Sequence, residues 1–328
     1  MGMSASSFSG FPADARILGL DIGSISVDVV LLDGLGTPLY SRYVRHHGQP
    51  DKVLCAELEA LERTHAGVAA AVTGTGADRV GRLLGACAVN EVIAQVAAAS
   101  FRYPQARSVI DIGGQDSKYI QLEPAGEGDG LRLKDFSVSS MCASGTGSFL
   151  DQQATRLGLD IETEFGEAAL RSRAPARIAG RCSVFAKSDM IHLQQKGTPV
   201  EDIVAGLCHA LARSFKANVV GVKALELPVA LVGGVAANAG VVKALRSVLH
   251  LEEDGLFVPE DFALSGAFGA ALFLLGGQGE AVPYKGLAAF REGLRQRVPM
   301  KTLVPLQPVS VSPPGCRGSS DAGPKVSA

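Results

Sequence analysis

The chain reads ILGLDIGS over residues 17–24 and SVIDIGGQD over residues 108–116. In both stretches an apolar run ends in the same Asp-Ile-Gly turn, and a third run, VALVGG over 229–234, ends in a pair of glycines. Short apolar runs that stop at glycine are typical of buried strands that enter tight turns. Since the Asp-Ile-Gly pattern occurs twice, at Asp21 and at Asp111, we expect a duplicated α/β unit.

The sequence also predicts a hairpin and three helices around these turns. Apolar residues alternate over 27–32, Asp33-Gly34 supplies a turn, and a second apolar run covers 39–44, which together indicate a hairpin. Helical patterns cover 146–157 and 183–195, and a glycine at 158 and at 197 closes each of them. A third helix is expected after Thr198-Pro199-Val200-Glu201, which has the pattern of a capping box with proline at the first helical position.

Composition excludes several classes of protein. The 328 residues are 47% hydrophobic with a formal net charge of −2 and no Trp, so global disorder and a basic nucleic-acid-binding surface are not expected. We expect no membrane span, because a spanning helix needs about 20 consecutive apolar residues. The absence of a secretory signal and six scattered cysteines favour a reducing cytoplasm. A leader over 1–15 and a Pro- and Ser-containing tail over 299–328 are expected to be disordered.

The two Asp-Ile-Gly turns have the residues that a phosphate site requires. Glycine lets the backbone approach a phosphate, whose oxygens then accept hydrogen bonds from backbone N–H groups. A carboxylate at the end of a strand can in addition hold Mg²⁺ through water. One such turn alone is more often only a turn, whereas two matched turns favour a nucleotide site.

Six motifs occur in order along the chain. They are residues 20–24, 111–116, CASGTG at 142–147, CSVFAKS at 182–188, GGVAAN at 233–238 and residues 266–271. Over about residues 16–276 the set closely resembles the activators of 2-hydroxyacyl-CoA dehydratases and the ATP-binding subunits of benzoyl-CoA reductase, the BcrAD/BadFG-type ATPases. The resemblance implies an α/β fold of the actin/heat-shock-protein/sugar-kinase (ASKHA) type, with ATP between two ribonuclease-H-like halves. The halves would be 16–103, completed by 265–290, and 104–264.

The resemblance also implies roles for individual residues. Asp21, Gly23 and Ser24 would form the first phosphate loop, and residues 111–116, with Gly113 and Gly114, the second. Near these loops, the adenosine would lie by Gly233, Gly234 and Asn238, and Gly266 also belongs to the cofactor site. Asp111, Gln115 and Asp116 are the candidates for hydrolysis, since Asp111 can hold a water of Mg²⁺ and Gln115 can orient the attacking water.

Two charged positions deserve comparison with that family. Where the family often carries Lys, five residues after the glycine of the first loop, this chain has Asp28. This departure leaves the phosphate charge to Mg²⁺ and to backbone donors, so it concerns the rate of ATP turnover rather than ATP binding. Lys118 follows the second loop, and it is either a phosphate ligand or a solvated charge on a strand.

Cys142 and Cys182 each precede an expected helix, whose positive N-terminal end would stabilise an anionic iron–sulfur cluster. By spacing alone, two buried thiols are the simpler interpretation. A [4Fe–4S] cluster needs about four cysteine ligands, so two chains would have to supply two each, in a homodimer. The resemblance implies this arrangement. Cys55 and Cys87 have no partner motif and are expected to pack in the core.

The resemblance implies an ATP-driven electron-transfer protein. A ferredoxin or flavodoxin would reduce the cluster, and ATP would drive a rotation of the subunits that sends a low-potential electron to a dehydratase or a reductase. Two alternatives remain open: a small-molecule kinase of the same fold without a cluster, for which Asp111 is the candidate base, and a nucleotide-sensing module without catalysis. A brown colour of the anaerobic protein would favour the first interpretation.

Overall fold

The computed structural model describes residues 11–65, 68–126, 130–139, 145–180, 182–280 and 282–296. Cys142, most of the expected leader and the whole expected tail therefore lie outside the described residues. Within the expected leader, Phe11 and Ala15 pack against the hydrophobic cluster that contains Ile17 and Val30.

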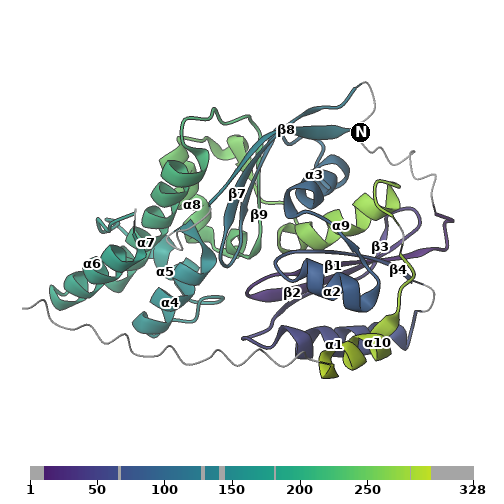
Figure 1. Cartoon of the computed structure of the whole chain (residues 1–328). Coiled ribbons are helices and arrows are strands. Elements are labelled where there is room, and N and C mark those ends of the chain that lie inside the picture. Colours follow the sequence, from purple (N-terminus) through teal and green to yellow (C-terminus); the bar gives the residue numbers. More distant parts are fainter. Residues whose placement is uncertain are drawn as a thin grey trace, which may run out of the picture.

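Two five-stranded sheets carry the fold, and they have the same strand order (Figure 1). In each sheet three consecutive strands pair antiparallel, a fourth strand pairs in parallel with the first of them, and a fifth pairs in parallel with the fourth. The first sheet contains β1 (Arg16–Ile22), β2 (Ser26–Asp33), β3 (Pro38–Arg45), β4 (Val68–Thr73) and β5 (Cys87–Ala88). The second contains β6 (Ser108–Ile112), β7 (Ser117–Pro124), β8 (Leu131–Val138), β9 (Val229–Val232) and β10 (Leu256–Phe257). The order β3-β2-β1-β4-β5 matches β8-β7-β6-β9-β10, which confirms the duplicated unit and the hairpin at β2–β3.

Helices cover both faces of each sheet, because consecutive residues of the strands are buried and their side chains point to both faces. On the first sheet, α1 (Pro50–Glu62), α2 (Ala77–Leu84) and α10 (Gly286–Arg295) cover one face, and α9 (Ser265–Leu275) covers the other. Between the sheets, α3 (Glu91–Arg102) packs against α9 and against the second sheet. The far face of the second sheet carries α4 (Gly147–Leu157), α5 (Phe165–Arg171), α7 (Val200–Phe215) and α8 (Ala239–Leu249).

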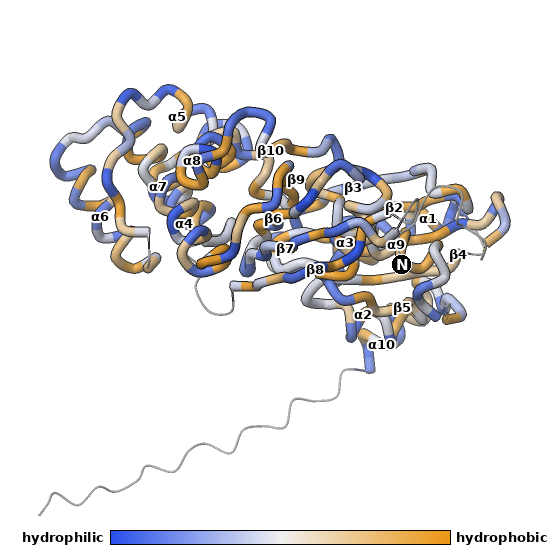
Figure 2. Tube along the Cα trace, turned by 90° about the horizontal axis from the view of Figure 1, so that it is seen from above, coloured by the Kyte–Doolittle hydropathy of each residue, from blue (hydrophilic) through white to orange (hydrophobic). Residues whose placement is uncertain are grey.

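The remaining helix, α6 (Ser183–Gln195), lies at the end of the molecule that is farthest from the first sheet (Figures 1 and 2). Figure 2 also shows that β9, which is fully buried, is hydrophobic along its length. No helix among the described residues is long and apolar enough to cross a bilayer.

Two of the predicted helices are confirmed and the start of the third is corrected. The helix α4 ends at Gly158 in the left-handed conformation, and α6 covers the predicted residues. The predicted capping box before α7 is wrong: Pro199 takes the N-cap position, and no side chain caps the helix. Instead, the Asp202 carboxylate accepts hydrogen bonds from Ser172 and from the N–H groups of Arg173 and Ala174, which holds the preceding chain against this end of α7.

Candidate functional site

A cavity of about 1370 Å³ opens between the two sheets. It is lined by every residue that the sequence suggested for nucleotide binding and hydrolysis: Asp21, Gly23, Ser24, Asp111, Gly113, Gly114, Gln115, Asp116, Gly233, Gly234, Asn238 and Gly266. Residues far apart in the chain meet here because equivalent strands of the two sheets end at the same place.

The two loops that follow β1 and β6 have the same backbone geometry. The N–H of Gly23 donates to the carbonyl of Ser26, and the N–H of Gly113 donates to that of Asp116, each at 3.0 Å. At Gly114 the loops approach each other so closely that a Cβ would lie 2.8 Å from Oγ of Ser24. Glycine at this position therefore allows both loops to face one ligand.

Glycines that follow β4 and β9 leave space for the carboxylates of Asp21 and Asp111. Gly74 and Gly233 have φ of +86° and +83°, a region that L side chains rarely adopt. A Cβ on Gly233 would lie 2.6 Å from Oδ1 of Asp111, and a Cβ on Gly74 would collide with Asp21. The sequence reasoning missed Gly74, although the run of apolar residues before it, followed by Thr-Gly, carried the same signal as the other strand ends.

The start of α4 is bonded directly to the second loop. The N–H of Gly147 donates to the carbonyl of Gly113, and the N–H of Ser148 donates to that of Gly114, both at 2.9 Å. The loop that lines the cavity and the helix that follows Cys142 in the chain are thus joined by two hydrogen bonds.

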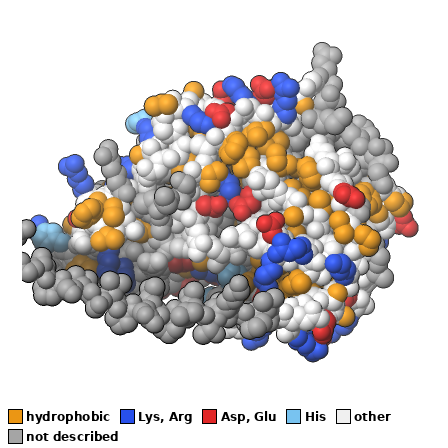
Figure 3. Space-filling model, in the orientation of Figure 1, with side chains coloured by type: hydrophobic (Ala, Val, Ile, Leu, Met, Phe, Trp, Pro, Cys, Tyr) orange, Lys and Arg blue, Asp and Glu red, His pale blue; other side chains and the backbone are white. Residues whose placement is uncertain are grey.

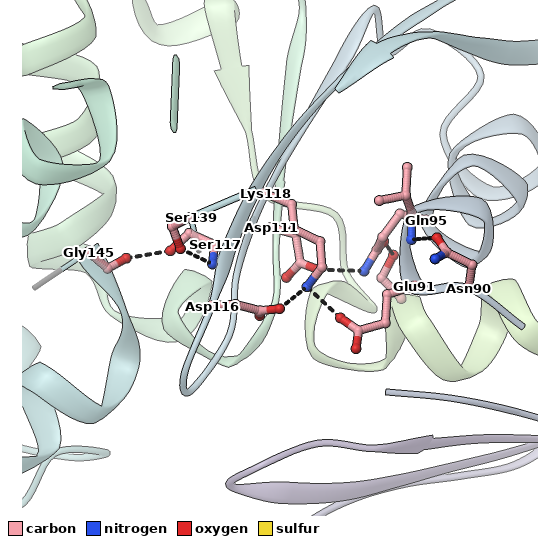
Figure 4. A network of polar contacts seen from close by, with 11 residues as sticks. Asn90, Glu91, Gln95, Asp111, Asp116, Ser117, Lys118, Ser139 and Gly145 are labelled. Carbon is pink, nitrogen blue, oxygen red and sulfur yellow. Dashed lines mark hydrogen bonds and ion pairs between the residues drawn. The ribbon is translucent and has the colours of Figure 1, made fainter. Parts of the chain in front are cut away.

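A buried polar network surrounds Asp111 (Figure 4). Lys118, on the neighbouring strand, places Nζ 2.6 Å from Oε2 of Glu91, 2.9 Å from Oδ2 of Asp116 and 3.8 Å from Oδ2 of Asp111. Nε2 of Gln95 donates to Oδ2 of Asp111 at 3.1 Å. Lys118 is 5% exposed, so the interpretation of this residue as a solvated strand charge is wrong.

The polar network continues from Asp111 into α9. Oε1 of Gln95 accepts a hydrogen bond from Ser265 at 2.6 Å, and the Ser265 hydroxyl lies 2.7 Å from that of Tyr103. Sequence reasoning gave no role to Glu91 or Gln95, because both stand on α3 outside any motif; their spacing of four residues on one helical face was the available signal.

Burial and charge shift the pKa values of the acids in the cavity. Burial, helped by the charges of Glu91 and Asp111, raises the pKa of Asp21 to about 7. Burial also raises the pKa of Asp111, against the opposing effect of Lys118. For Lys118, burial disfavours the ammonium, but the carboxylates of Asp111, Glu91 and Asp116 outweigh it and raise the pKa.

Asp28 also lines the cavity, and it lies directly opposite Asp21 in the pairing of β1 with β2. It is 6% exposed, and burial together with the charge of Asp21 raises its pKa well above the ordinary value. The acid at the position where the resemblance led us to compare lysine is therefore inside the site.

Cys182 is the N-cap of α6 and is half-buried. Two residues of the first turn of this helix, Val184 and Phe185, are 65% and 66% exposed, and Ile191 is 40% exposed. Figure 3 shows hydrophobic side chains gathered at this end of the molecule. No three His, Cys, Asp or Glu side chains are grouped to hold a metal within the part of the chain that the structure describes, which does not include Cys142.

The other cysteines of the described residues are associated with the cores. Cys55 packs against the core under α1, and Cys87 packs against the core under α9. Cys208 is fully buried, which raises the pKa of its thiol to about 12.

Comparison with known proteins agrees with this geometry. The sequence profile of the BadF/BadG/BcrA/BcrD ATPase family matches residues 18–273. The 2-hydroxyisocaproyl-CoA dehydratase activator of Clostridioides difficile is 35% identical over 185 residues, which are 56% of this chain and 66% of that relative. The activator of lactoyl-CoA dehydratase of Anaerotignum propionicum is 32% identical over 260 residues, 78% of this chain and 96% of that protein.

A solved structure is also similar. The activator of the 2-hydroxyisocaproyl-CoA dehydratase from Clostridium difficile, with bound ADPNP, superimposes with a TM-score of 0.69 at 30% identity and covers 88% of this chain and 99% of its own. Together with the paired sheets, this similarity confirms the ASKHA fold.

Proposed function

The chain belongs to the BadF/BadG/BcrA/BcrD ATPase family, and from this membership we propose that it is an ATP-dependent activator that passes a low-potential electron to a 2-hydroxyacyl-CoA dehydratase or a related CoA-thioester reductase. The observation that carries the proposal is the direct bonding of the second loop to α4. It joins the cavity to the helix that follows Cys142 in the chain.

The residues of the cavity suit ATP with Mg²⁺. Backbone N–H groups of the two loops, at Gly23 and Ser24 and at Gly113 to Gln115, would bind the phosphates. Asp21 and Asp111 would hold Mg²⁺, which neutralises phosphate charge during hydrolysis. Gln115 would orient the attacking water.

Other residues support this arrangement without contacting the reacting phosphate. The ion pair of Asp116 with Lys118 fixes the ammonium beside Asp111. Gly233, Gly234 and Asn238 would lie along the adenosine, and the amide oxygen of Asn238 is already engaged, because it accepts from the N–H of Val241 and caps α8. Gly266 permits α9 to approach the Asp21 carboxylate.

The surroundings of Cys182 suit a shared cluster. Its thiol is free and half-buried at the N-terminus of a helix of 13 residues, where the aligned backbone dipoles favour negative charge. A [4Fe–4S] cluster held by Cys142 and Cys182 of each of two chains would supply one-electron transfer at low potential. The exposed Val184 and Phe185 supply apolar surface that a second chain would cover in a homodimer.

The partners follow from the same proposal. A ferredoxin or flavodoxin would deliver the electron to the homodimer, and the dehydratase or reductase would accept it. A rotation of one chain against the other on nucleotide exchange would give the partner enzyme access to the proposed cluster.

Anaerobic purification tests the proposal. We expect a brown dimer that absorbs near 400 nm, contains about four iron atoms per two chains and hydrolyses ATP without an acceptor alcohol. Reduced, it should activate a 2-hydroxyacyl-CoA dehydratase only with ATP. A colourless monomer that consumes ATP only when an alcohol is added would support the kinase instead.

A further inference from the structure

Asp28 occupies in the first sheet the position that Lys118 occupies in the second. Asp28 faces Asp21 in the β1–β2 pairing, and Lys118 faces Asp111 in the β6–β7 pairing. The strands are equivalent in the two sheets. One sheet therefore places an ammonium beside its cavity aspartate, whereas the other places a second carboxylate there.

A hydroxyl extends this row of polar groups across a third strand. Thr73 faces Asp21 in the β1–β4 pairing, so Asp28, Asp21 and Thr73 lie side by side on neighbouring strands and their side chains share one face of the sheet. It is the face that α9 covers. The residue equivalent to Thr73 in the second sheet is Val232, which has no side-chain oxygen.

Two oxygens of this row lack a partner. Oδ1 of Asp28 and Oγ1 of Thr73 are buried and make no hydrogen bond within the described residues. Asp28 is 6% exposed and lines the cavity, and Thr73 is fully buried. Native proteins rarely leave buried polar atoms unpaired, so a missing ligand is the simplest account of both.

The charges near the row are also unbalanced. Burial and the carboxylates of Asp21 and Asp111 act together against ionisation of Asp28, and only a hydrogen bond with Ser26 opposes them. The nearby ammonium of Lys118 is already bonded to the carboxylates of α3 and of the second loop. Two adjacent carboxylates and a hydroxyl are hard oxygen donors whose combined charge matches a divalent cation.

We propose that Asp28 and Asp21 bind a divalent cation of the Mg²⁺ or Mn²⁺ class before any nucleotide enters, with water completing its coordination and the Thr73 hydroxyl bonded to one of those waters. In the first sheet this cation takes the place that the lysine ammonium takes in the second. It is distinct from a metal that arrives with the phosphates, and its binding in the absence of ATP does not require the function proposed above. The competing arrangement is a proton shared by the two carboxylates.

Equilibrium dialysis of the nucleotide-free protein, as purified anaerobically, against Mn²⁺, with Mn and any Fe counted separately, tests the proposal. We expect about one Mn²⁺ per chain in the unmodified protein. Asp28→Asn, which keeps the shape of the side chain, should weaken binding by about tenfold or more. Thr73→Val should weaken it by a smaller factor, and Asp28→Lys, which copies the second sheet, should abolish it.

Asp151→Asn is the matched control, because Asp151 lines the same cavity but is already paired with Arg45 at 2.7 Å; it should retain the Mn²⁺. Unchanged Mn²⁺ affinity in a folded Asp28→Asn protein overturns the site, as does an unmodified protein that takes up no Mn²⁺ without nucleotide. Adding a non-hydrolysable ATP analogue separates the two proposals. A further Mn²⁺ should then bind with the nucleotide to the unmodified protein and to Asp28→Asn. If this further Mn²⁺ does not bind, the result counts against the nucleotide site alone.

Discussion

Nζ of Lys118 lies 3.8 Å from Oδ2 of Asp111, the residue directly opposite it on the adjacent strand, and is bonded more closely to Glu91 and Asp116. A single ammonium thus holds three carboxylates together at the edge of the cavity. Its loss would leave the buried carboxylate of Asp111, and the partly exposed carboxylates of Glu91 and Asp116, without their shared cation.

We therefore predict that Lys118→Met lowers the free energy of unfolding by roughly 2–3 kcal/mol, because the buried carboxylate of Asp111 loses its cation, whereas Glu91 and Asp116 remain partly solvated. Chemical denaturation of the nucleotide-free protein measures this. Lys134→Met is the control: Lys134 pairs with Glu226 at 2.8 Å on the exposed surface, and its loss should change stability little. Equal effects of the two substitutions would contradict the structural role of Lys118.

Gly233→Ala should reduce the ATPase rate by about a hundredfold, since a Cβ at Gly233 would displace the carboxylate of Asp111. Gly158→Ala is matched for backbone strain. Gly158 has φ of +70° and nothing within 4 Å of its Cβ position, so that substitution costs only about 1–2 kcal/mol of stability. Steady-state ATP hydrolysis is measured for both variants. If Asp111 is displaced, only Gly233→Ala is slowed; if backbone strain is the cause, both variants are slowed equally.

Asp111→Asn and Gln115→Ala should each reduce Mg²⁺-dependent ATP hydrolysis by roughly a hundredfold while ATP still binds. Calorimetric titration with an ATP analogue, alongside the rate measurement, separates binding from hydrolysis. Full hydrolysis in both variants would remove these residues from the hydrolytic step.

The duplicated strand ends, the hairpin and the bounds of α4 and α6 could be predicted because each depends on neighbours in sequence. Glycine after an apolar run predicts a strand end wherever it occurs. The capping box before α7 was predicted wrongly, since proline already held the N-cap position and left Thr198 outside the helix.

The environment of Asp111 could not be predicted in the same way. Its partner Gln95, and Glu91, which pairs with Lys118, come from α3, which no motif marks, and only the packing of α3 between the sheets brings them near. The alignment of Asp28, Asp21 and Thr73 likewise depends on strand register, which becomes known only when β4 is placed beside β1.

Without nucleotide and without added divalent cation, we predict that stability falls as pH rises from about 4 to about 7. The pKa of Asp21 is raised from 3.8 to about 7 in the folded chain, so the folded state binds the proton more tightly than the unfolded state does. This proton-linked stabilisation is complete below the unfolded pKa and is lost as pH passes through the folded pKa; it amounts to about a few kcal/mol. Thermal unfolding of Asp21→Asn should show a flatter pH profile, and an unchanged profile would contradict the assignment.

Cys142→Ser and Cys182→Ser should each lose iron and the absorbance near 400 nm, since each removes two of the four proposed ligands from a dimer. Cys55→Ser should keep both, because Cys55 packs against the core under α1. Iron analysis after anaerobic reconstitution decides the matter. Full iron content in both of the first two variants would exclude these ligands.

The last prediction concerns the hydrogen bonds that join Gly147 and Ser148 of α4 to the second loop. If nucleotide exchange moves that loop, the start of α4 must move with it, and the exposure and solvation of a cluster at Cys142 should change. We expect the midpoint potential of the cluster, or its accessibility to a chelator, to differ between the ADP form and the form with a non-hydrolysable ATP analogue. A shift of 30 mV corresponds to about 0.7 kcal/mol for one electron, which differential nucleotide binding readily supplies.

Gly147→Ala should reduce this difference between the two nucleotide states, because its Cβ would lie 3.0 Å from Val235 and 3.2 Å from the carbonyl of Gly113 and so disturb the contact between α4 and the second loop. Gly197→Ala, at a position with nothing within 4 Å, should leave the difference intact. Identical potentials and chelation rates in the two nucleotide states of an intact, iron-loaded dimer would show that the cavity and the cluster are not coupled.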